Sequence, residues 1–127
     1  MIDFNQNTFF KLKTADAEKG KKLVEELLIP EEQVLSAYRD VRDWVVFTDR
    51  RIISVNVESV TGKKKNFTSL PYAKVSAFSV ETAGVLDMDS RMELWFSGLG
   101  RVRFEFTGGS DTLAISRMIA RYALDNT

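Results

Sequence analysis

The hydrophobic period of the sequence changes at Gln33, and this change limits the possible folds more than any other feature. Beyond that residue, apolar and polar side chains alternate along short segments, as in strands that bury one face. Seven segments follow the pattern: Gln33–Arg39, Asp43–Thr48, Arg51–Glu58, Lys64–Leu70, Lys74–Glu81, Arg91–Ser97 and Arg101–Thr107. Most turns between them are far shorter than a parallel crossover, so the sequence predicts an antiparallel sheet in a small barrel or sandwich.

The last hairpin also has a predicted register. A three-residue loop, Gly98-Leu99-Gly100, pairs Phe96 with Val102 and Met92 with Phe106. Apolar residues then face apolar residues, whereas a one-residue slip would invert the faces of the strand.

Two amphipathic helices are expected to flank the strands. The first is predicted over residues 14–29, with Thr14 or Asp16 as its cap and Pro30 at its end. The second begins after Gly109 and has an apolar stripe made of Ile115, Met118, Ile119 and Tyr122. We therefore expect a single, mainly β domain over residues 1–127, in three parts. These are an N-terminal arm and helix (1–30), a seven-stranded barrel (31–110) and a C-terminal helix (111–127).

Composition excludes several classes of chemistry. Eighteen basic and eighteen acidic residues cancel to a net charge of zero, which argues against a general nucleic-acid binder. The absence of Cys and His removes disulfides, common zinc sites and any Ser-His-Asp relay. Asp87 and Asp89 lie two apart, but no calcium-binding loop follows them. We assign no catalytic, cofactor-binding or metal-ligating residue, and an enzyme using carboxylates stays a remote alternative.

The chain shows no signal for export or membrane insertion. No basic leader precedes an apolar core, and no apolar run approaches the length needed to span a bilayer. A cytoplasmic protein is the expectation.

Three stretches resemble a known family. Phe47–Ile53 (FTDRRII) is similar to a hairpin typical of bacterial pleckstrin-homology (PH) domains, and Phe78–Gly84 and Asp87–Leu94 resemble the central segment of the same family. The resemblance covers about Glu31 to Leu124. It implies a PH-like fold of seven antiparallel strands and a C-terminal helix. It also implies a binding or assembly module without catalytic activity, whose characterised relatives form ring-like homo-oligomers.

Eukaryotic PH domains often bind phosphoinositides through a basic pattern in their first hairpin loop. The corresponding loop here, Arg39-Asp40-Val41-Arg42-Asp43, is short, and two aspartates offset its arginines. Phosphoinositide recognition is therefore not carried over.

One strand carries apolar residues on both faces, which favours assembly. Trp44 and Val46 lie opposite Val45 and Phe47, although a half-exposed strand should alternate with polar residues. Either the first helix covers the outer face or another subunit does. Arg51 contacts a neighbouring subunit or ligand, or pairs within its own sheet. The candidate oligomer or partner surface consists of Phe4, Phe9, Phe10, Trp44, Val46 and Arg51.

The densest basic run, Lys63-Lys64-Lys65, suggests a second function. With Arg39 and Arg42 it could contact an anion or an acidic lipid surface. The alternative is a solvated hairpin whose lysines discourage pairing between strand edges. A homo-oligomeric, protein-binding module is thus the first hypothesis, and a peripheral binder of anionic membranes is the second.

Overall fold

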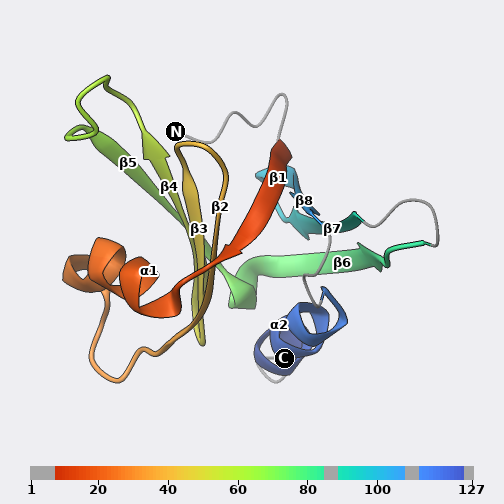
Figure 1. The fold of residues 1–127 in the computed structure, drawn as a ribbon. Coiled ribbons are helices and arrows are strands. Elements are labelled where there is room, and N and C mark those ends of the chain that lie inside the picture. The colour runs from red at the N-terminus through yellow and green to blue at the C-terminus, as the bar shows by residue number, and fades with distance from the viewer. Residues whose placement is uncertain (1–7, 85–88, 108–111, 125–127) are drawn as a thin grey trace.

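The computed structural model describes residues 8–84, 89–107 and 112–124. Its fold is mainly β with a C-terminal helix, as predicted (Figure 1). The strands are β1 (Thr8–Ala15), β2 (Val34–Arg39), β3 (Trp44–Thr48), β4 (Arg51–Val57), β5 (Lys65–Pro71), β6 (Val75–Glu81), β7 (Ser90–Phe96) and β8 (Gly100–Phe106). The helices are α1 (Ala17–Val24) and α2 (Thr112–Leu124), with short 3-10 helices η1 (Glu25–Leu27) and η2 (Tyr72–Lys74).

The strands form one open sheet and not a closed barrel. Their order is β5-β4-β3-β2-β1-β8-β7-β6, so β5 and β6 are the two edges. The prediction of seven strands is wrong, because residues 8–15 add an eighth at the centre of the sheet. The prediction of a wholly antiparallel sheet is also wrong, since β1 pairs in parallel with β8.

An irregularity explains why β1 escapes a period-two analysis. The β1–β8 register shifts between Phe9 and Leu12, and Lys11 within this interval has a left-handed φ of 53°. Such a bulge interrupts the alternation that marks a strand. Thr14, predicted to begin the first helix, lies in β1 instead.

The first helix is therefore shorter than expected. Asp16 caps it, since its carboxylate accepts hydrogen bonds from the backbone N–H groups of Glu18 at 2.7 Å and Lys19 at 3.3 Å. The α-helix ends at Val24 and continues as the 3-10 helix η1.

The predicted register of the last hairpin is wrong by two residues. Phe96 pairs with Gly100 and Met92 with Phe104, so the loop is Ser97-Gly98-Leu99. Gly98 and Gly100 have φ values of 82° and 105°, which residues with a Cβ atom rarely adopt. Both registers set apolar residues opposite one another, so the turn conformation decides between them.

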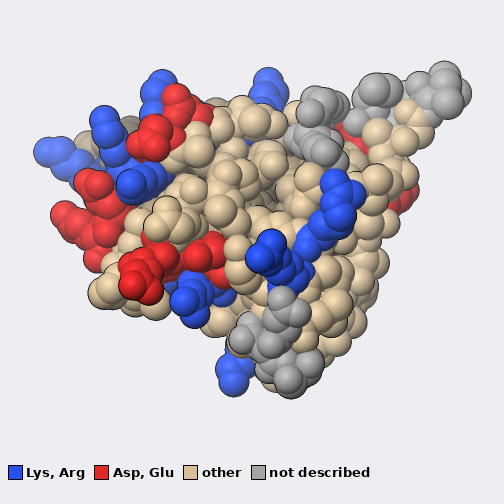
Figure 2. All heavy atoms as spheres, turned by 90° about the horizontal axis from the view of Figure 1, so that it is seen from below, with Lys and Arg blue, Asp and Glu red and all other residues tan. Residues whose placement is uncertain are grey.

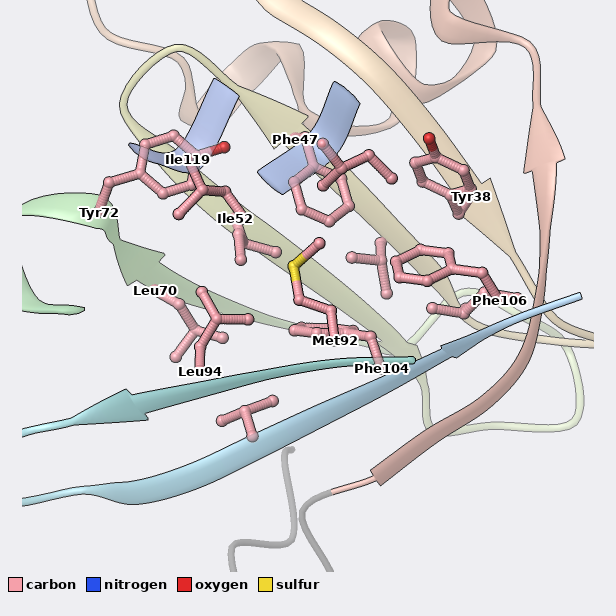
Figure 3. Packing of buried hydrophobic residues seen from close by; sticks show 14 of the residues in the cluster. Tyr38, Phe47, Ile52, Leu70, Tyr72, Met92, Leu94, Phe104, Phe106 and Ile119 are labelled. Carbon is pink, nitrogen blue, oxygen red and sulfur yellow. The ribbon is translucent and has the colours of Figure 1, made fainter. Parts of the chain in front are cut away.

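The main core lies on the inner face of the curved sheet, and α2 covers it (Figure 3). Tyr38 of β2 joins the two halves of the sheet, with its ring edge-on to Phe47 at 5.6 Å and to Phe106 at 5.0 Å. Tyr72 stacks on Tyr122 of α2 at 6.0 Å and donates a hydrogen bond to the Thr48 carbonyl at 2.7 Å. Burial raises the pKa of the Tyr72 hydroxyl above its ordinary range.

A second core on the outer face of the sheet explains why β3 carries apolar residues on both of its faces. Val24 of α1 and Val46 of β3 are both fully buried in a cluster completed by Ala37, Ile53 and Val55. Trp44 packs against the edge of this cluster. Of the two alternatives left by the sequence, the structure shows the first: the helix of the same chain covers the outer face.

Gly20 sets the distance between α1 and the sheet. A Cβ atom at this position would lie 2.7 Å from the Cβ atom of Ala37 on β2. The glycine that weakens the helix by propensity is therefore the residue that lets it approach the strand.

We expect Gly20→Ala to lower the free energy of unfolding by up to about 2 kcal/mol. Lifting α1 away from β2 costs about 1–3 kcal/mol, and the gain in helix propensity returns about 1 kcal/mol. Urea unfolding of Gly20→Ala and of the double variant Gly20→Ala/Ala37→Gly measures the effect, and the double variant should show a favourable coupling. A stabilised single variant would contradict this packing.

Candidate functional site

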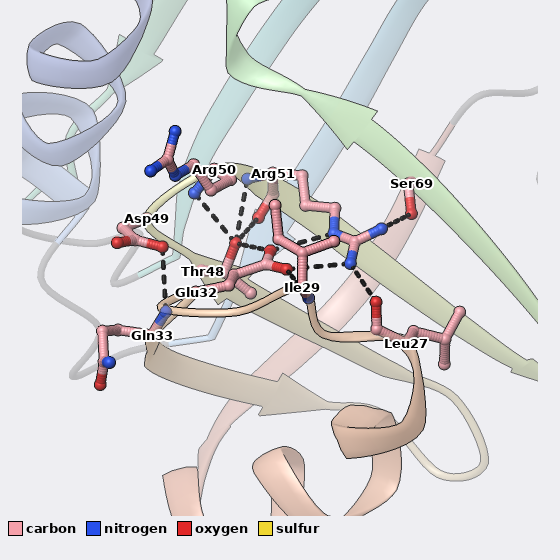
Figure 4. A network of polar contacts seen from close by, with 9 residues as sticks. All are labelled: Leu27, Ile29, Glu32, Gln33, Thr48, Asp49, Arg50, Arg51 and Ser69. Carbon is pink, nitrogen blue, oxygen red and sulfur yellow. Dashed lines mark hydrogen bonds and ion pairs between the residues drawn. The ribbon is translucent and has the colours of Figure 1, made fainter.

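A polar network surrounds Arg51 at the β3–β4 turn (Figure 4). The guanidinium holds both carboxylate oxygens of Glu32, with Nε donating to Oε2 at 3.0 Å and Nη2 to Oε1 at 2.9 Å. Further donations reach the Leu27 carbonyl at 2.6 Å and Ser69 Oγ at 3.0 Å. The Glu32 side chain is fully buried, and that of Arg51 is 19% exposed. Arg51, the second of the two arginines in the FTDRRII stretch, is thus bound to a carboxylate of its own chain.

The network fastens the segment after α1 to the sheet. Thr48 Oγ1 donates to Glu32 at 2.7 Å and accepts the backbone N–H groups of Arg50 and Arg51 at 3.0 Å. Because Glu32 lies between η1 and β2, these bonds hold the segment that follows α1 and η1 against the sheet. Arg50 is exposed, and its side chain points away from the carboxylate in Figure 4.

The pKa of Glu32 reflects two opposing effects. Burial raises it, but hydrogen bonds from Arg51, Thr48 and the Ile29 N–H, together with the charge of Arg51, bring the pKa below its ordinary value of 4.5. The folded protein therefore binds this proton less readily than the unfolded chain. Glu32 contributes stability above about pH 4.5, and this contribution is lost as the pH falls through the lowered pKa.

We accordingly expect the free energy of unfolding to fall between neutral pH and about pH 3, with a smaller fall in Glu32→Gln. Urea unfolding across this range measures the difference between the slopes. Glu31→Gln, which changes an exposed neighbour, is the control and should keep the slope of the unchanged protein. Equal slopes in all three proteins would contradict the role of Glu32.

The predicted anion-binding residues come together at one end of the sheet. We call Arg39, Arg42, Lys63, Lys64 and Lys65 the basic rim. The β2–β3 turn and the β4–β5 loop lie at the same end of the sheet (Figure 1). Arg42 Nη2 of the turn donates to the Ser59 carbonyl of the loop at 2.9 Å, which joins the two loops. All five side chains are exposed. At the opposite end of the molecule, acidic and basic side chains are mixed on one face (Figure 2).

Two lysines that were not among the predicted anion-binding residues lie beside this rim. Lys13 of β1 pairs with Arg39 of β2, and the bulge at Lys11 lies next along the strand. Both lysines line a cleft of about 440 Å³ between β1 and the β2–β3 turn, together with Arg39 and Val41. No local signal relates these lysines to Arg39, because β1 itself was not recognised.

The predicted partner surface is only partly available in a single chain. Val46 is fully buried and Trp44 is partly buried, with the Arg39 guanidinium 5.1 Å from the centre of the indole ring. Phe9 and Phe10 belong to β1, but their side chains lie outside the described structure, as does all of Phe4.

Two further observations on the described residues concern metal binding and the crossing of a membrane. Within them, no three Asp or Glu side chains approach one another closely enough to hold a metal ion; Asp87 lies outside the described ranges. In the same part of the chain, no helix has the length and hydropathy needed to cross a bilayer.

The sheet has two halves, each antiparallel within itself, which enclose an apolar core, and a C-terminal helix covers that core. This arrangement defines a PH-like domain. The comparisons with known proteins agree with this class. A family model described as the bacterial PH domain matches residues 3–123. The chain therefore belongs to the bacterial PH domain family.

Similar proteins include two of known structure. A protein with a pleckstrin-homology domain from Shewanella loihica PV-4 is 34% identical, with a TM-score of 0.77 over 89% of this chain and 97% of that chain. A pleckstrin-homology domain from Shewanella amazonensis SB2B is 40% identical, with a TM-score of 0.65 over 86% of this chain and 89% of that chain. The uncharacterized protein YjqA of Bacillus subtilis (strain 168) is 43% identical over 74% of this chain and 77% of its own length.

Proposed function

We propose that this chain is a non-enzymatic PH-like scaffold module of the cytoplasm that self-assembles into a homo-oligomer and binds protein partners. One observation carries the proposal. The sheet ends in two strands, β5 and β6, that have no second strand partner within the described residues. Unpaired edges present backbone N–H and C=O groups that a strand of another chain can bind. The family resemblance adds ring-like assembly as the expected form.

The two edges differ in how well they resist pairing. β5 begins with Lys65, directly after two further lysines, and ends at Pro71, and such residues discourage pairing between edges. β6 consists of small and apolar residues, and its single charged residue, Glu81, forms an ion pair with Arg91 at 3.5 Å. Phe78 of β6 packs on the core and is only partly buried. The β6 edge is therefore the better candidate for assembly.

Light scattering coupled to gel filtration tests the proposal. We expect a mass that is a multiple of 14.4 kDa at micromolar concentration. Ala77→Lys on β6 should lower this mass, whereas Ala83→Lys in the following exposed loop should leave it unchanged. A monomer in the unchanged protein would refute self-assembly.

A second candidate function is peripheral binding to an anionic membrane. The observation that favours it is the gathering of five basic side chains from two joined loops in the basic rim. Co-sedimentation with phosphatidylglycerol vesicles at low and at physiological salt is the test. Absence of binding at low salt, where screening is weakest, would eliminate this function.

A further inference from the structure

We propose that residues 8–27 exchange between two copies of the chain, so that β1 and α1 of each copy complete the fold of the other. These residues comprise β1, α1 and η1, and we call them the N-terminal unit. The described residues from 34 to 124 are the body, and residues 28–33, which connect the two parts, are the hinge. The exchange goes beyond the assembly proposed above, because it does not use the β6 edge.

The strands of the body pair with their neighbours in sequence. Antiparallel pairings connect β2 to β3, β3 to β4 and β4 to β5, and a separate group is formed by β6, β7 and β8. Within the described residues, β1 joins the two groups, because it pairs with β2 on one side and with β8 on the other. Local pairings form faster than remote ones. Each group therefore forms from its own hairpins, and the place between them accepts β1 from either copy.

The N-terminal unit contributes a fully buried residue to each of the two cores. Leu12 of β1 lies in the main core, and Val24 of α1 lies in the second core. Gly20 lets α1 approach Ala37 of β2 closely. The same unit of a second copy reproduces all of these contacts without any new surface. The exchanged and the unexchanged forms therefore bury the same apolar side chains and differ chiefly at the hinge.

The hinge contains a tight turn with an unfavourable residue. The Glu32 N–H donates to the Ile29 carbonyl at 3.1 Å, and Glu31 between them has a left-handed φ of 72°. A proline at the second position and a left-handed residue at the third are typical of a type II turn, in which the third residue is usually glycine. Pro30 fits this pattern and Glu31 does not. The closed hinge is therefore strained.

Opening the hinge removes this strain. Ile29, Pro30 and Glu31 are exposed, so they can extend without uncovering a core. Six extended residues span about 20 Å, which lets two bodies lie side by side. Short hinges under strain favour the exchange of an element between identical chains. The exchanged form thus gains its free energy over the closed form at residues 28–33.

A pair of cysteines across β1 and β2 reports which copy supplies β1. Lys13 and Arg39 are directly paired, and both side chains are exposed. Their separation in such a pair suits a disulfide, and the chain has no cysteine of its own. Lys13→Cys/Arg39→Cys is refolded at low and at high protein concentration, oxidised mildly and run on a non-reducing gel. We expect closed monomers at low concentration and a growing share of covalent dimers at high concentration.

Glu93→Cys/Arg103→Cys is the matched control, because both of its residues are paired within the body. It should give monomers at both concentrations. Monomers from both cysteine pairs at high concentration would overturn the exchange and leave self-assembly through the β6 edge to stand on its own mass measurement. Dimers from both pairs would mean random cross-linking, which also contradicts the exchange. Adding Ala77→Lys to the first pair should leave its dimers in place, and their loss would assign them to the β6 edge instead.

A second measurement changes the hinge in the Lys13→Cys/Arg39→Cys background. Glu31→Gly permits the left-handed φ without strain and so favours the closed hinge. We expect the ratio of dimer to the square of monomer to fall about 25-fold, at about fivefold for each of the two hinges. Glu31→Ala removes the same carboxylate but keeps a Cβ atom, so it should preserve the ratio. An unchanged ratio in Glu31→Gly would refute the role of hinge strain in the exchange.

Discussion

Arg51→Met should lower the free energy of unfolding by about 3–5 kcal/mol, because it leaves the fully buried Glu32 carboxylate without its countercharge. The same change removes the donors to the Leu27 carbonyl and to Ser69. Methionine keeps much of the length of the arginine stem, so the loss reports chiefly on the charged and hydrogen-bonding atoms.

Urea unfolding monitored by tryptophan fluorescence measures this loss. Arg50→Met is the matched control: the neighbouring arginine is exposed, and we expect a change within about 0.5 kcal/mol. In the double variant Arg51→Met/Glu32→Gln, no unpaired charge is buried, so part of the lost stability should return. Equal effects of Arg50→Met and Arg51→Met would contradict the network.

Val46→Asp should prevent folding or lower the free energy of unfolding by more than about 4 kcal/mol, since it buries an unpaired charge beneath α1. Val46→Ala, which removes apolar surface without adding charge, should cost about 2 kcal/mol and keep the fold measurable.

Val41→Asp is the control for this prediction. It makes the same change at a valine that is 90% exposed, and we expect an effect within about 0.5 kcal/mol. Circular dichroism and urea unfolding compare the variants, and light scattering records their mass. A stable Val46→Asp protein of reduced mass would mean that another subunit, and not α1, covers this face.

The seven strands after Gln33 were predicted within one residue at every end, because short turns bound most of them and β7 and β8 keep a regular alternation of buried and partly exposed residues. Strand β1 was missed because its alternation is interrupted. Its bulge places Phe9 and Leu12, three positions apart, beside two residues of β8 that are only two positions apart. Its parallel pairing joins segments that are remote in the sequence, and no local pattern carries that information. The two-faced β3 was recognised, but its cover depends on the close approach at Gly20.

The candidate site was predictable in part. Arg39 and Arg42 were grouped with the lysine run by charge alone, and the hydrogen bond from Arg42 to Ser59 gives the physical reason for their proximity. Lys11 and Lys13 could not be added without β1. For Arg51, the sequence left open a contact with another subunit or a pair within its own sheet. Glu32 lies just before β2, where strand periodicity gives no sign of a partner.

The place of β1 has a consequence for how the chain folds. Thr107, at the end of β8, donates its backbone N–H and its hydroxyl to the Leu12 carbonyl at 3.0 and 3.2 Å, across 95 positions of sequence. Closing so long a loop costs only slightly more entropy than closing a shorter one, but contacts between remote segments slow folding. During synthesis, β1 leaves the ribosome long before β8 exists. The central strand of the sheet must therefore wait for the last strand to be made before its hydrogen bonds are complete.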